Sequence, residues 1–323
     1  NMLAVKVFAE GVAEQIKAYL PPEYASVTCS VKEQNKTNGV MQVGIQADMP
    51  GHAASPIVYM ESFYNEVRSG ESMDQIMRNI AEVIQDALDG PALDQSIRIE
   101  EFESIKDYLS VMVVNTAENR KLLEQVPHKE VADLSLLCYA DLPVDQGGYN
   151  ATFKITEQML QKWNVDREEL FQIASENTIP ANEPVLQNLE EVTRQILIGG
   201  AAPENLLKKE FDFSNQEAIL LVLTNEKKNF GAAMMFEPKV MDRLSQSFPE
   251  GFYILPSSLH EVLILPDREG ILPKELGAMV REVNRSQVEK MEQLSDRVYR
   301  YDKEAQKIVE VPESIERGKE MSR

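Results

Sequence analysis

The residues best suited to chemistry lie together in one short run, Ser257-Ser258-Leu259-His260-Glu261-Val262. Serine hydroxyls, imidazoles and carboxylates are the groups that hydrolases use as nucleophile, base and orienting acid. We expect the run to lie between and on two strands, where His260 and Glu261 point to opposite faces and cannot form a dyad. A structural turn is therefore the first interpretation, and a binding surface or a catalytic patch are the alternatives.

The pair His260-Glu261 also resembles the start of a zinc-protease motif. That motif needs a second histidine four residues after the first, on a helix, so that both nitrogens reach one zinc ion. Position 264 is Ile264 and the expected element is a strand, so the motif is not met. With three histidines in the chain, we expect neither a metal site nor a cofactor.

Two polar residues from other parts of the chain complete the candidate patch. His128 follows Val126-Pro127, where we expect it to cap or hydrogen-bond a turn, and Asn225 follows an apolar strand, where turn chemistry is the ordinary role. An enzyme would need these side chains to converge on one cleft. The full candidate patch is His128, Asn225, Ser257, Ser258, His260 and Glu261.

The charge balance restricts the class of partner. The 323 residues include 33 Lys and Arg against 53 Asp and Glu, a formal net charge of −20. This argues against a nucleic-acid partner, which requires clustered cations, and favours a protein partner with basic groups.

The sequence also indicates a compartment. No apolar run approaches the roughly 18 residues of a membrane-spanning helix, and charged residues interrupt the first twenty positions, so we expect no signal peptide and no membrane contact. The two cysteines, Cys29 and Cys138, lack the spacing of a disulfide framework or zinc site. We predict a cytoplasmic protein with both thiols packed as small apolar groups.

Elements that would position these residues are visible in the apolar periodicity. The sequence predicts an opening helix ended by Pro21-Pro22, a hairpin turning at Asn38-Gly39, a helix capped by Ser72, and apolar strands at 109–114, 134–139, 218–223 and 259–265. It also predicts a helix carrying Leu186, Leu189, Val192 and Ile196 on one face, and a final hairpin over 298–301 and 308–311. This order predicts an α+β fold with mixed or antiparallel sheets and packed helices in two or three αβ segments. The expected segments are 1–105, 106–203 and 204–312, followed by a frayed tail at 313–323.

Several runs resemble a known family. They are Thr224-Asn225 with Phe230-Gly231-Ala232-Ala233, the run from Tyr253 to Val262, the run from Leu294 to Asp302, and the segment from Asn115 to His128. Together they resemble, over nearly the whole chain, an uncharacterised domain-of-unknown-function family from anaerobic Gram-positive gut bacteria, often encoded on mobile elements. The resemblance implies a bacterial cytoplasmic setting and no particular chemistry.

Two hypotheses of different classes follow. The first is a non-enzymatic interaction or accessory protein that acts through an acidic surface, since phosphate loops, dinucleotide fingerprints and nucleophile elbows are all missing from the sequence. The second is a hydrolase-type or small-molecule enzyme, or a ligand-binding sensor, that uses an interdomain cleft. The sequence leaves the partner, the substrate and the oligomeric state undetermined.

Overall fold

The computed structural model describes residues 2–52, 55–90, 93–94, 96–144, 150–209, 219–256 and 258–313. The chain forms two compact units. The first comprises residues 1–97 with 142–151, and the second comprises 98–141 with 152–323. Within the described ranges, no helix is both long enough and apolar enough to span a lipid bilayer.

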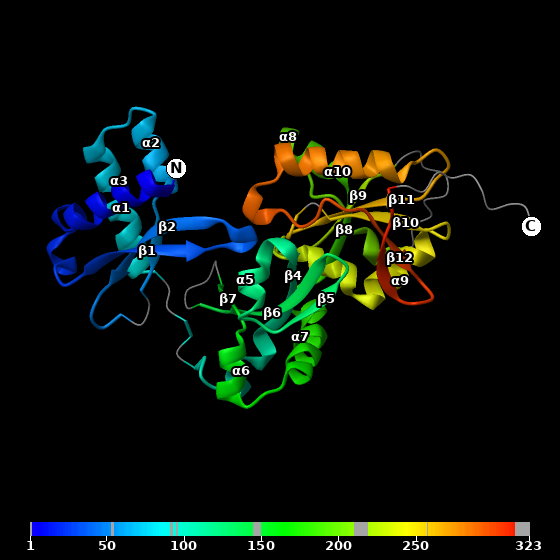
Figure 1. Cartoon of the computed structure of the whole chain (residues 1–323), viewed down its shortest axis with the longest axis horizontal. Helices are drawn as coiled ribbons and strands as arrows, with labels where there is room; N and C mark the ends of the chain where they lie inside the picture. The colour runs from blue at the N-terminus through cyan, green and yellow to red at the C-terminus, as the bar shows by residue number, and fades with distance from the viewer. Residues whose placement is uncertain are drawn as a thin grey trace, which may run out of the picture. The chain divides into compact units, whose positions relative to one another are not determined.

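The first unit is a three-stranded antiparallel sheet covered by helices (Figure 1). Its elements are α1 (Met2–Gln15), β1 (Thr28–Asn35), β2 (Met41–Asp48), β3 (Ile57–Tyr59), α2 (Glu61–Arg68) and α3 (Met73–Leu88). The hairpin between β1 and β2 turns where the sequence predicts, because Asn38 and Gly39 both adopt positive φ angles, 59° and 66°. The predicted cap of α3 is also confirmed, since the Ser72 hydroxyl accepts the backbone N–H of Gln75 at 3.2 Å.

The second unit carries two further sheets and most of the helices. Its strands are β4 (Leu109–Asn115), β5 (His128–Val131), β6 (Leu134–Leu142), β7 (Ala151–Lys154), β8 (Pro184–Asn188), β9 (Leu221–Asn225), β10 (Phe252–Leu255), β11 (Val262–Pro266), β12 (Tyr299–Asp302) and β13 (Lys307–Glu310). Its helices are α4 (Phe102–Ile105), α5 (Arg120–Leu123), α6 (Glu157–Trp163), α7 (Arg167–Ala181), α8 (Leu189–Ile198), α9 (Pro238–Ser247) and α10 (Pro273–Gln287), with a 3₁₀ segment η7 at Gly231–Phe236.

The two sheets of this unit share one core. The smaller sheet has the order β4-β6-β5 with β7 beside β6, and the larger has the order β13-β12-β10-β11-β9-β8. Buried residues of both sheets, such as Leu137 and Leu223, belong to the same apolar cluster. The three sheets formed by the described residues are antiparallel, which confirms the predicted α+β class.

Two details of the predicted elements are wrong. Leu186 lies on β8 rather than on a helix, because its backbone pairs with Leu223 of β9 and the helix starts only after Asn188 caps it. The strand expected at 259–265 begins at Val262. Ser258 forms an isolated antiparallel bridge with Gln293, and residues 259–260 form a bend, because the Leu259 N–H donates to the Glu292 carbonyl instead of to a strand.

The expected segments 106–203 and 204–312 both contribute to the second unit. β8 comes from the earlier segment, and β9 from the later one, and the two strands are neighbours in the larger sheet. The boundaries at 105, 203 and 312 themselves stay predictions.

Candidate functional site

Phe230 stands at the centre of a tight cluster between β9 and η7, which we call the Phe230 turn (residues 224–231 with 258–260). Its φ of 54° is left-handed, a conformation that a bulky side chain adopts only when its surroundings impose it. The Phe230 N–H donates to Nδ1 of His260 at 3.1 Å, and the two rings lie 5.6 Å apart. On its other side the Phe230 ring meets Tyr139 of β6 edge-on at 5.0 Å.

Both ring nitrogens of His260 have polar neighbours. Because Nδ1 accepts the Phe230 N–H, the neutral imidazole carries its proton on Nε2. That nitrogen lies 3.6 Å from Oε1 of Glu292. The lone pair that a general base would use is therefore occupied by the backbone of Phe230.

The side-chain amide of Asn225 forms two hydrogen bonds with the backbone of Asn229. Its Nδ2 donates to the Asn229 carbonyl at 2.8 Å, and its Oδ1 accepts the Asn229 N–H at 3.1 Å. The residue is 3% exposed. The buried amide of Asn225 thus provides the hydrogen-bond partners that the backbone N–H and carbonyl of Asn229 do not find in the backbone of the turn.

The remaining described members of the run hold the bend before β11. The Ser258 hydroxyl accepts the His260 N–H at 3.1 Å, and the His260 carbonyl accepts the Thr224 hydroxyl at 2.7 Å. Loss of water around its carboxyl raises the pKa of Glu261, while nearby His260 and Lys228 oppose the shift. Ser257 lies outside the described residues.

His128 makes a separate set of contacts. It lies on β5, where Nδ1 contacts the Val126 carbonyl at 3.0 Å and Nε2 lies 3.8 Å from Oε1 of Glu130. Among the contacts of the described residues, none joins His128 to His260. The structure therefore brings Asn225, Ser258 and His260 together and holds His128 elsewhere in the smaller sheet.

A second polar cluster, which the sequence analysis missed, joins the turn between β5 and β6 to α10 and to the segment before β12. We call it the Ser295 cluster (Asn115, Asp133, Asn284 and Ser295). Oδ2 of Asp133 accepts the Ser295 hydroxyl at 2.8 Å, and the Ser295 carbonyl accepts Nδ2 of Asn284 at 2.9 Å. Burial raises the pKa of Asp133, although Ser295 and Arg297 oppose the shift. Nδ2 of Asn115 also donates to Oδ2 of Asp133, at 3.4 Å. The signal was present in the sequence, because Ser295 and Asn115 lie in the runs quoted for the family resemblance, but no known motif interprets them.

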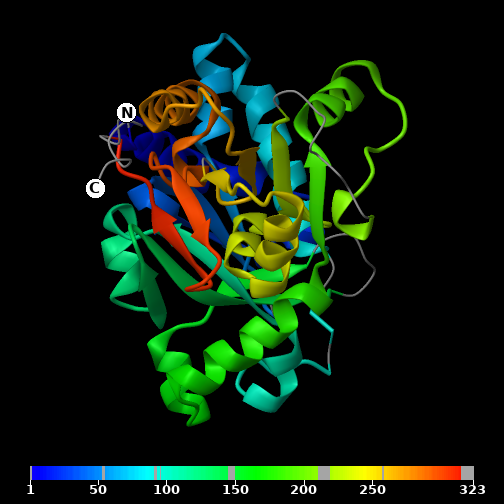
Figure 2. The ribbon, with the colours of Figure 1, turned by 90° about the vertical axis from the view of Figure 1, so that its right-hand side faces the viewer.

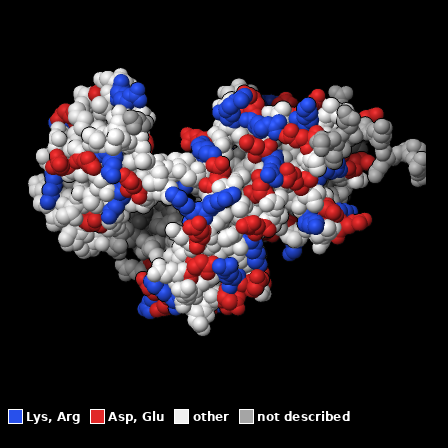
Figure 3. Space-filling view, viewed as in Figure 1, with Lys and Arg blue, Asp and Glu red and all other residues white. Residues whose placement is uncertain are grey.

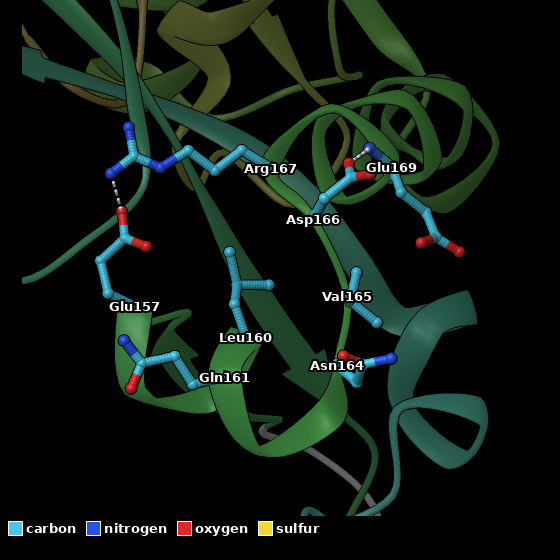
Figure 4. Close-up of a pocket in the computed structure, with 8 residues that line it drawn as sticks. All are labelled: Glu157, Leu160, Gln161, Asn164, Val165, Asp166, Arg167 and Glu169. Carbon is cyan, nitrogen blue, oxygen red and sulfur yellow. Dashed lines mark hydrogen bonds and ion pairs between the residues drawn. The ribbon is translucent and has the colours of Figure 1, made fainter.

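A surface pocket opens at the corner between α6 and α7 (Figure 4). An ion pair of 2.5 Å between Glu157 and Arg167 spans one side of it. None of the described candidate residues lines this pocket. Its lining is Glu157, Leu160, Gln161, Asn164, Val165, Asp166, Arg167 and Glu169.

The described parts of the chain contain neither a cluster of metal ligands nor an activated thiol. There, no group of three or more His, Cys, Asp or Glu side chains is placed to hold a metal ion. Cys29 and Cys138 are both free, and burial raises the pKa of both thiols, which disfavours the reactive thiolate. The catalytic role of the candidate patch and the enzyme hypothesis stay predictions.

The quoted runs contribute to the Phe230 turn, the bend before β11 and the Ser295 cluster, all in the second unit. A family of unknown function (DUF5688) matches residues 5–303, which include all of them. The chain belongs to this family. DUF5688 membership confirms the resemblance to a domain-of-unknown-function family and assigns no activity. No curated protein and no solved structure matches the chain.

The most exposed apolar side chains described in this DUF5688 chain lie at the end of α8. Ile196, Leu197 and Ile198 are 76%, 75% and 77% exposed, and no residue of the helix is buried. Figure 2 shows α8, in green at the upper right, at the periphery of the second unit. We call these three residues the apolar end of α8. Consecutive residues on a helix spread over more than half of its circumference, so these three cannot all turn toward the protein body.

Proposed function

We propose that this chain is a non-enzymatic interaction protein that binds a protein partner through the apolar end of α8. The observation that carries the proposal is the exposure of Ile196, Leu197 and Ile198, each about three-quarters accessible. Burying one such side chain in a partner is worth about 2 kcal/mol, so three together can support specific binding.

Local interactions hold α8 in shape without tertiary burial, which suits a helix that presents itself to a partner. Oδ1 of Asn188 caps its start by accepting the Glu190 N–H at 2.9 Å. Gly199, at a φ of 75°, ends the helix and donates its N–H to the Gln195 carbonyl at 2.9 Å. The helix is therefore formed before binding, and binding pays little ordering entropy.

The partner we propose is a protein with an apolar groove and a cationic rim. The first turn of α8 carries Glu190 and Glu191, and the one cation of the helix, Arg194, is paired with Glu190 at 3.1 Å. The chain as a whole carries −20, which attracts basic partners over long range. On the face in Figure 3 acidic and basic side chains are interspersed. The specific contact that we propose is the apolar end of α8.

We also propose the setting that the family resemblance implies, a bacterial cytoplasm in a mobile-element context, and no nucleic-acid partner. Two free cysteines support the reducing compartment. The excess of acidic side chains supports the exclusion of nucleic acid.

The test is a titration with a purified partner. The immobilised chain captures its partner from native lysate, and the captured protein is purified and titrated by calorimetry against Ile196→Gln/Leu197→Gln/Ile198→Gln. We expect the variant to bind at least about tenfold more weakly, and the native complex to form with a negative heat-capacity change and to weaken with salt.

A matched control uses a second helix with exposed apolar residues. Leu3 and Val7 on α1 are 68% and 59% exposed, and Leu3→Gln/Val7→Gln should bind the partner with native affinity. The proposal fails if the α8 variant binds as the native chain does, if both variants lose equal affinity, or if the lysate holds no saturable partner.

A further inference from the structure

β1 is an open edge of the sheet in the first unit. The strand order is β1-β2-β3, so β1 has one neighbour along its eight residues. Edge strands expose backbone groups that can pair with another strand, and proteins usually cover or shorten them. β1 is longer than β3 at the other edge, which has three residues.

The hydrogen bonds of β2 show which backbone N–H and carbonyl groups of β1 point away from the sheet. The Met60 N–H donates to the Val43 carbonyl, and the Ala47 N–H donates to the Pro56 carbonyl, both at 2.9 Å. Odd-numbered residues of β2 therefore face β3, and its even-numbered residues face β1.

The same alternation continues into β1. Ser30 and Lys32 stand opposite Gln46 and Gly44 and bond toward β2. The N–H and carbonyl groups of Cys29, Val31 and Glu33 point away from the sheet, and no hydrogen bond among the described residues reaches them.

Side chains on the two faces of β1 differ in character. Cys29 and Val31 share the core face with Ala47 and Ile45, which are completely buried, yet they are themselves only half-buried. On the other face Ser30 and Lys32 are exposed. Glu33 also lies on the core face, but it is exposed and pairs with Lys6 of α1 at 2.6 Å. A strand added to β1 would extend the apolar surface at Cys29 and Val31 and leave Lys32 in water.

We propose that a second copy of this chain occupies the edge, with the two β1 strands antiparallel about a two-fold axis through Val31. An isologous antiparallel pair must place one residue opposite itself. With Val31 opposite its own copy, Cys29 faces Glu33 of the second copy, and the outward groups of one strand meet those of the other.

Charge and the length of strand that is paired together select this register over its neighbours. With the axis at Val31, Lys32 faces Ser30 of the second copy, and no like charges are opposed. Moving the axis toward the C-terminus by one or two residues places Lys32 opposite Lys32 or Glu33 opposite Glu33. Moving it toward the N-terminus, to Ser30 or Cys29, opposes no like charges but pairs only residues 28–32 or 28–30 of β1. The axis at Val31 also pairs residues 28–34, nearly the whole strand, and joins two three-stranded sheets into one of six strands.

Disulfide trapping tests the register. In a hydrogen-bonded antiparallel pair the Cα atoms lie about 5.5 Å apart, within disulfide range. Glu33→Cys should therefore crosslink to the native Cys29 of a second copy under mild oxidant and give a covalent dimer on a non-reducing gel. Gln34→Cys, one residue along and on the other face, keeps both native thiols and should give none. Cys29→Ser in the Glu33→Cys background should abolish the dimer.

The molar mass in solution and a proline substitution in β1 test whether two copies associate. Light scattering over a concentration series should give twice the chain mass for the unmodified protein. Val31→Pro should return it to one chain mass with its circular dichroism intact, because the lost N–H points away from β2. A single-chain mass for the unmodified protein at every concentration, or equal crosslinking by Glu33→Cys and Gln34→Cys, would overturn the proposal.

Discussion

The Phe230 turn and the apolar end of α8 lie in the same unit and use their side chains in opposite ways. In the turn, each described polar side chain of the candidate patch, such as Asn225 and His260, forms a hydrogen bond with a backbone group. At the end of α8, three large apolar side chains contact almost nothing. Side chains that already form contacts within the fold stabilise the protein, whereas side chains without such contacts are available to bind a partner. The predictions below separate these two roles by measuring unfolding and binding side by side.

Gly231→Ala should have the largest effect on stability. A Cβ at this position would lie 2.9 Å from the Asn225 nitrogen and closer still to Thr224 Oγ1 and the His260 carbonyl. We expect a loss of about 2–3 kcal/mol in the free energy of unfolding, measured by urea denaturation. Gly11→Ala is the control, because a Cβ at Gly11, inside α1, meets nothing within 4 Å and should stabilise by about 0.5–1 kcal/mol. Equal effects of the two variants would contradict the tight packing of the turn.

Asn225→Ala should rank second. The change leaves the N–H and carbonyl of Asn229 without their partners in a buried site, which costs about 2 kcal/mol. Asn65→Ala, at an exposed position on α2, should change the free energy of unfolding by less than about 0.5 kcal/mol. If Asn225→Ala is as stable as the native chain, the amide has another role than bracing the turn.

Glu237→Gln should change how the free energy of unfolding depends on pH. Glu237 follows η7, and burial raises its pKa from 4.5 to about 7, opposed by Lys239. The folded state therefore binds this proton more tightly than the unfolded state, and its contribution to stability is complete below pH 4.5 and is lost as the pH rises to about 7. Urea titrations at several pH values should show that the variant loses less stability over this interval than the native chain. An unchanged slope would contradict the shift.

The triple glutamine variant of α8 should have the smallest effect on unfolding. Glutamine is a good helix former, and the replaced side chains have almost no packing to lose. We expect a change within about 0.5 kcal/mol in urea denaturation, with unchanged helix content. A large loss of stability would mean that these residues belong to the fold.

Sequence periodicity predicted most of the fold because it reports burial. The alternation at 27–31 and 41–47 and the Asn38-Gly39 pair were enough to predict the first hairpin, and Ser72 predicted the start of α3. Periodicity failed at Leu186, since an apolar residue one turn before a helix fits the helical spacing and a buried strand equally well. The cap residue Asn188 was the local signal that separated the two.

The candidate patch could be predicted only as a set of residue types. The sequence predicted turn roles for Ser258 and Asn225, and their contacts are of that kind. It placed His260 on a strand, whereas the residue lies in the bend before β11. It could not show that His260 faces Phe230, because thirty residues separate the pair and only the pairing of β9 with β11 brings them together. The exposure of Ile196, Leu197 and Ile198 was equally hidden, since apolar residues in a helix ordinarily predict a buried face.

One titration tests the central claim that the chain works by contact at α8 and not by chemistry at the Phe230 turn. The partner purified by capture is titrated with the triple α8 variant and with His260→Gln, each at a temperature where circular dichroism shows it to be folded. We predict native affinity for His260→Gln and at least about tenfold weaker binding for the α8 variant. Native affinity for the α8 variant together with loss of binding by folded His260→Gln would contradict the account.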